Sequence, residues 1–157
     1  MMQTLRDIGQ PIVGLEFHED FPHEELNPNG YWDLPLAETR DGLKTYYKGK
    51  AVKLAGAALY LTDTAFIRAV IRCERNKKDA IESVLKNLQI DGRRMGLSST
   101  IGNAELCYEG NYHFTNLAIE KHKKPVLEIW FEDMLKNKNI EIEKIRSFLC
   151  QHGQQSE

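Results

Sequence analysis

The decapeptide EFHEDFPHEE, at residues 16–25, concentrates groups that could do chemistry: two histidines and five carboxylates. A zinc site of the HExxH type places its two histidines on one helical face with a glutamate base between them. Here His18 and His23 are five positions apart, and Pro22 interrupts any helix. The glycine hinge of a calcium-binding loop is also missing. We therefore expect no metal and no cofactor, and interpret the stretch as an acidic surface.

Other candidates for catalysis lack the surroundings that their chemistry needs. The hydroxyl run at 98–100 has no GxSxG turn around it. The stretch GRRMGLSSTIG at 92–102 contains arginines and glycines but lacks the lysine of a phosphate-binding P-loop. The three cysteines are widely spaced and odd in number, which argues against a disulfide scaffold or a zinc knuckle. We expect a protein without catalytic activity.

The charge of the chain is divided along its length. Residues 1–39 carry one basic and eight acidic residues, net −7, whereas residues 40–94 carry thirteen basic and six acidic residues, net +7. Such a division indicates either a charged partner or an internal match between the two segments. The overall charge of −2 argues against a general nucleic-acid-binding protein, which usually has a basic excess.

Length and composition are those of one globular domain spanning residues 1–157. No apolar run approaches the roughly 20 residues of a membrane-spanning helix, and the first residues lack the apolar core of a secretory signal. We expect a cytoplasmic protein with reduced thiols. Within the domain, residues 12–41 form a long acidic loop segment, and loops of this length are often functional.

The apolar pattern predicts an α+β fold. Alternating runs at 43–47, 52–61, 66–73, 106–108, 112–120 and 126–131 predict strands, and 3.6-residue periodicity predicts helices at 77–88 and 141–150 after a short one at 4–8. We expect an antiparallel sheet of about five to six strands with two to three helices packed on one face. The similar stretches ALYLTD (58–63) and EIWFED (128–133) suggest two similar halves.

Aromatic residues near the acidic segment suit a protein interface. Trp32 follows the turn Asn-Pro-Asn-Gly beside the carboxylates, and Tyr108, Tyr112 and Trp130 are further anchors if they are exposed. Carboxylates would steer a basic partner while the aromatic side chains hold it. The partner-binding residues that this interpretation selects are Glu16, Glu19, Asp20, Glu24, Glu25, Trp32 and Asp33.

The segments LRDIGQPI and DGLKTYYKGKAVKLAGAALYL, together with the acidic patch, resemble the small α+β immunity proteins of bacterial toxin–immunity systems, such as those of contact-dependent inhibition or of pyocins and colicins. The resemblance is one of general layout over most of the chain. It implies a cytoplasmic protein that binds and neutralises a cognate basic toxin, often a nuclease, without catalysis of its own.

Two alternatives stay open. The element order is also similar to that of type III secretion chaperones, which would imply a homodimer that holds an effector segment; the long 12–41 loop has no counterpart there. A basic stretch with interleaved Tyr46, Tyr47 and Tyr60 would suit single-stranded nucleic acid, although an RNP-like pattern is lacking.

Overall fold

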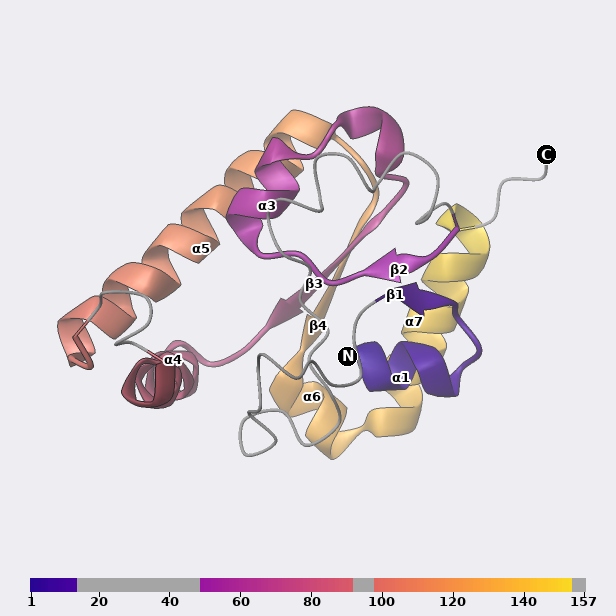
Figure 1. Cartoon of the computed structure of the whole chain (residues 1–157). Helices are drawn as coiled ribbons and strands as arrows, with labels where there is room; N and C mark the ends of the chain where they lie inside the picture. The colour runs from indigo at the N-terminus through magenta and orange to yellow at the C-terminus, as the bar shows by residue number, and fades with distance from the viewer. Residues whose placement is uncertain (14–48, 92–97, 154–157) are drawn as a thin grey trace.

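The computed structural model describes residues 1–13, 49–91 and 98–153. Helices dominate these ranges, and the strands are short (Figure 1). The elements are α1 (Met2–Asp7), β1 (Ile12–Val13), β2 (Ala51–Val52), α3 (Gly56–Leu61), the 3-10 helix η2 (Thr64–Phe66), β3 (Val70–Glu74), α4 (Lys77–Asp91), α5 (Ile101–His122), β4 (Val126–Trp130), α6 (Phe131–Lys136) and α7 (Lys138–His152).

The predicted antiparallel sheet is wrong. Within the described ranges the strands form two separate parallel pairs, β1 with β2 and β3 with β4. The chain leaves β3, passes through α4 and α5, and returns along β4, which is the long crossover that a parallel pair requires. Helices also lie on both faces of the β3–β4 pair, whereas the prediction placed them on one face only.

Three predicted strands are wholly or largely helical in the structure. The run at 52–61 contains α3, because its three alanines and three leucines favour a helix once β2 ends at Val52. The runs at 106–108 and 112–120 both lie inside the 22-residue helix α5. Its inward stripe is made of small and polar residues, such as Ala104, Ala118 and His122, so an apolar periodicity of 3.6 is hard to recognise.

The suggested duplication is also wrong. ALYLTD forms most of α3 and its C-terminal turn, whereas EIWFED runs from β4 directly into α6. Other predictions are confirmed: the helix at 77–88 is α4, that at 141–150 is α7, and strands occupy most of 126–131 and the later part of 66–73. Asn76 caps α4, since its side-chain oxygen accepts the Lys78 amide at 3.0 Å.

The core joins segments that are far apart in the sequence. Met2 and Leu5 of α1, Ile129 of β4 and Ile145 of α7 are buried against one another. In Figure 1, α1 and α7 lie side by side next to the β1–β2 pair. Burying such side chains contributes roughly 1.5–3 kcal/mol each, so this cluster holds the N- and C-terminal elements together.

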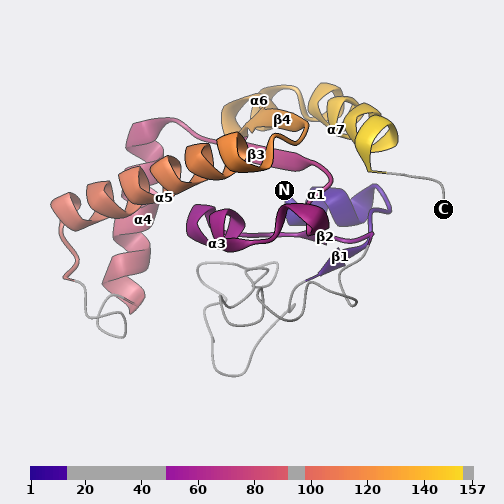
Figure 2. The same ribbon diagram turned by 90° about the horizontal axis from the view of Figure 1, so that it is seen from above.

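A second contact fixes α5 against α3. The Gly56 amide donates to the Asn111 side chain at 2.8 Å, and a Cβ at Gly56 would come within 2.5 Å of α5 atoms. At the other end of α3, the buried His122 ring lies 2.8 Å from both the Leu59 carbonyl and the Thr64 hydroxyl. The view from above shows the two helices running alongside each other (Figure 2). Since α5 also covers β3, these contacts position the site.

Candidate functional site

The carboxyl ends of the parallel strands β3 and β4 meet at one edge of their pair, where α4 and α6 begin. In open α/β sheets this edge is the usual position of a binding site. Aromatic and cationic side chains gather there. We call this set the aromatic edge, and it consists of Tyr108, Tyr112, Trp130, Phe131, Arg72, Arg75 and Lys77.

Three aromatic side chains of this edge keep much of their surface in solvent. Tyr112 is 40% exposed, Trp130 44% and Phe131 46%. Tyr108 stacks on Tyr112 with ring centroids 6.1 Å apart. Because large aromatic side chains are normally covered in a folded domain, several half-exposed rings at one edge indicate an interaction surface.

A cationic side chain lies close to each of three rings. The Arg72 guanidinium lies 4.7 Å from the Tyr112 centroid, that of Arg75 lies 4.9 Å from Phe131, and the Lys77 ammonium lies 5.9 Å from Tyr108. Cation–π contacts at this distance restrict both groups. The rings are therefore held in place by contacts within the folded chain.

Arg72 is the centre of the polar contacts. Its side chain is largely buried, its Nε pairs with Glu74, and its Nη1 donates to Asn116 at 3.0 Å and approaches Glu128 at 3.5 Å. Its Nη2 is buried without a hydrogen-bond partner in the described part of the chain. In the register of the strands, Arg72 faces Glu128 and Glu74 faces Trp130, so all four side chains lie on the α5 side of the pair.

The electrostatics of the edge follow from these contacts. A hydrogen bond with Glu109 raises the pKa of Lys77, and burial with the nearby Glu74 charge raises the pKa of Tyr108. The Asn76 amide donates to the Glu132 carboxylate at 2.8 Å, which lowers the pKa of Glu132. Lys77 therefore stays charged and Tyr108 stays neutral near pH 7.

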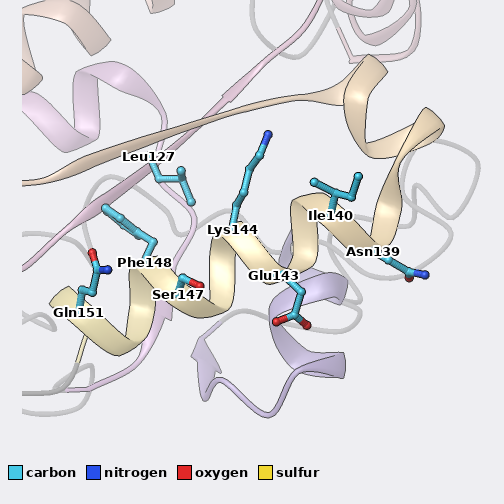
Figure 3. A pocket seen from close by; sticks show the side chains of 8 residues that line it. All are labelled: Leu127, Asn139, Ile140, Glu143, Lys144, Ser147, Phe148 and Gln151. Carbon is cyan, nitrogen blue, oxygen red and sulfur yellow. The ribbon is translucent and has the colours of Figure 1, made fainter.

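A groove lies elsewhere on the surface, along α7. It has a volume of about 720 Å³. Figure 3 shows Leu127 of β4 and Phe148 of α7 approaching each other across it, while Glu143 points away. Its apolar residues, Leu127, Ile140 and Phe148, are interrupted by polar ones, and its charges are already paired: Lys144 bonds to Glu141, and Glu143 to Arg146. This groove has no group free to select a ligand by charge.

The seven predicted partner-binding residues, Glu16, Glu19, Asp20, Glu24, Glu25, Trp32 and Asp33, lie outside the described residues. The other predicted anchors are brought together, because Tyr108, Tyr112 and Trp130 all belong to the aromatic edge. Sequence reasoning missed Phe131 and the role of Arg72 and Arg75. The signal available for Arg75 and Phe131 was their position directly after β3 and β4, whereas Arg72 lies in the middle of β3.

The residues considered for catalysis have structural roles where they are described. Thr100 caps α5 by accepting the Asn103 amide, and Ser99 donates to the Leu88 carbonyl at 2.9 Å. The cysteines are free; Cys73 and Cys150 are exposed, and Cys107 is partly buried. Across the described ranges no three His, Cys, Asp or Glu side chains are grouped to hold a metal ion. None of the helices in those ranges could cross a membrane.

The strongest features of the aromatic edge are the exposure of its rings and the cations that hold them. Comparison of the chain with protein-family models, curated proteins and solved structures finds no match.

Proposed function

We propose that the chain is a binding protein without catalytic activity that neutralises a basic protein toxin, as its resemblance to immunity proteins implies. The observation that supports protein binding is the aromatic edge, where Tyr112, Trp130 and Phe131 stay 40–46% exposed. Tryptophan, tyrosine and arginine are the residue types that supply most of the binding energy in protein interfaces.

The fixed geometry of the edge favours tight association. Binding costs free energy when side chains must be ordered, and this cost falls when they are already held. Arg72 and Arg75 hold their rings at 4.7 and 4.9 Å. The two arginines are themselves anchored, since Arg72 pairs with Glu74 and the residue after Arg75 is bound to Glu132.

The charge of the edge favours a protein over a nucleic acid. Arg72, Arg75 and Lys77 are balanced by Glu74, Glu109 and Glu132, which lie beside them. A phosphate backbone is bound by unbalanced cations, and its affinity depends on how many of them there are. An interface with another protein instead uses aromatic side chains whose neighbouring charges are balanced.

The preference for a basic partner rests on the acidic segment. The basic part of the chain already has acidic partners among the described residues, because Arg72 and Lys77 pair with carboxylates of β3, β4 and α5. We expect the carboxylates at 16–33 to face the partner, to pair with its lysines and arginines, and to accelerate association.

The test is capture of the partner from the native lysate with the tagged chain, followed by purification of what is captured. We expect a basic protein whose toxic activity is abolished by an equimolar amount of the chain. Trp130→Ala should weaken the complex by about 30-fold, corresponding to a hot-spot loss of about 2 kcal/mol. Ile101→Ala, at a more exposed apolar position at the start of α5, serves as the control and should bind normally.

Several results would contradict the proposal. A partner that binds Trp130→Ala and the wild type equally would exclude the aromatic edge. Reversing Glu19, Glu24 and Glu25 to lysine should slow association and reduce its salt dependence; an unchanged rate would exclude the acidic surface. Steeply salt-dependent retention of a single-stranded oligonucleotide would favour the nucleic-acid alternative.

A further inference from the structure

A cleft lies beside the aromatic edge, between the C-terminal half of α5 and the β3–β4 pair. Its volume is about 550 Å³. It is continuous with the edge, because Arg72 lines the cleft and also lies on the Tyr112 ring. The residues that line it are Arg72, Asn116, Ile119, Glu120, Val126 and Glu128.

The carboxylates of the cleft are only partly neutralised. The Arg72 charge is met mainly by Glu74 and by the Asn116 oxygen, whereas its approach to Glu128 is long, at 3.5 Å. The Glu128 side chain is 54% exposed. Glu120 is exposed, and it forms no ion pair with any residue that the structure describes.

The helix adds to this negative potential. Glu120 lies in the last turn of the 22-residue α5, where the carbonyl end of a helix carries a partial negative charge. The Lys121 ammonium is held on the α3 side, where it binds the Tyr60 carbonyl at 2.5 Å, and Lys121 does not line the cleft. Lys123 and Lys124 follow in the turn to β4, and neither lines the cleft.

The lining excludes an anionic ligand. Arg72 is the cation of the cleft, yet its unpartnered Nη2 is buried and so out of reach of a bound molecule. A phosphate or carboxylate would meet Glu120 and Glu128 first. The apolar side chains, Ile119 and Val126, can instead cover the methylene stem of a long side chain whose charged end reaches the carboxylates.

We propose that this cleft receives a basic side chain, lysine or arginine, from the protein partner. The inference rests on the proposed function, since it assigns one contact of that same interface. The stem lies along Ile119 and Val126, and the cationic end binds Glu120 and Glu128. Insertion beside Tyr112 places this contact next to the rings that anchor the complex.

The cleft can be tested without the partner, by titrating the full ¹⁵N-labelled chain with acetyl-Gly-Lys-Gly-amide or acetyl-Gly-Arg-Gly-amide and following amide chemical shifts. The control peptide carries norleucine, which keeps the methylene stem but lacks the charge. We expect shifts at Asn116, Glu120 and Glu128 with one or both basic peptides and none with norleucine. Comparing the two basic peptides shows which side chain the cleft prefers.

The variant Glu120→Gln/Glu128→Gln should bind the basic peptide about tenfold more weakly, since two exposed ion pairs are removed. Glu82→Gln, at an exposed position on α4, is the matched control and should bind like the wild type. The spectrum of each variant reports its folding. Equal shifts with norleucine, shifts confined to other residues, or an unchanged affinity of the double variant would each overturn the proposal. These outcomes do not depend on the capture experiment, so the cleft and the toxin assignment can fail separately.

Discussion

The two faces of the β3–β4 pair differ sharply. On one face, Ile71, Leu127 and Ile129 pack against α1 and α7 in the apolar core. On the other, Arg72, Glu74 and Glu128 form ion pairs beneath α5, and Trp130 stays half exposed. Parallel strands usually have apolar side chains on both faces. Here alternate residues of the same strands form the apolar core on one side and, as we propose, part of a recognition surface on the other.

This difference predicts that the core face contributes the most to stability. Ile129→Ala should lower the free energy of unfolding by about 2–5 kcal/mol, since it leaves a cavity at a site where the side chain is completely enclosed. Chemical denaturation would measure the loss. Leu135→Ala, at a well-exposed position on α6, is the control and should change stability by less than about 0.5 kcal/mol.

On the polar face, the contribution to stability should depend on the ion pairs rather than on any single residue. Arg72→Met should cost about 2–3 kcal/mol, because it leaves the largely buried Glu74 without its partner. Adding Glu74→Leu should restore most of that loss. If the double variant were as unstable as the sum of both single variants, the two faces would not differ in the way we describe.

The polar face is also expected to depend on how closely α5 approaches. Gly56→Ala should cost about 1–3 kcal/mol, because the new methyl group would overlap the Asn111 carbonyl and the Thr115 side chain. Gly110→Ala is the matched control within α5: its Cβ meets no atom within 4 Å, so the change should stabilise the helix. Equal effects of the two substitutions would show that the α3–α5 contact is not tight.

The smallest expected effect is on the pH dependence of stability. The pKa of Glu132 is lowered in the folded protein by the Asn76 amide, so its contribution is complete above the pKa of the unfolded state and disappears as the pH falls through the lowered value. Glu132→Gln should therefore flatten the loss of stability toward acid pH, as measured by thermal unfolding at a series of pH values.

Asn76→Ala provides the control for that measurement. It removes the side-chain cap of the Lys78 amide but keeps the backbone amide that Glu132 accepts. Stability should fall by about 1 kcal/mol at every pH, and the acid slope should stay as in the wild type. A slope that changed with Asn76→Ala and not with Glu132→Gln would contradict the assignment to Glu132.

Local patterns were sufficient for part of the fold. The 3.6-residue periodicity at 77–88 predicts α4, because a helix of this length is specified by its own residues. In the 52–61 run and in α5, alternation of apolar residues suggested strands, and the structure is helical. Those segments bury small and polar side chains against each other, so their neighbours rather than their own periodicity determine the conformation.

For the candidate site, the sequence by itself determined the aromatic anchors Tyr108, Tyr112 and Trp130 and the division of charge along the chain, because residue type and position carry that information. Only the tertiary structure decided that β3 and β4 run parallel and that their ends bring these rings beside Arg72 and Phe131. Strand direction depends on where the α4–α5 crossover returns the chain. That return is fixed by long-range packing of Ile129 and Ile145 with α1, which no local pattern encodes.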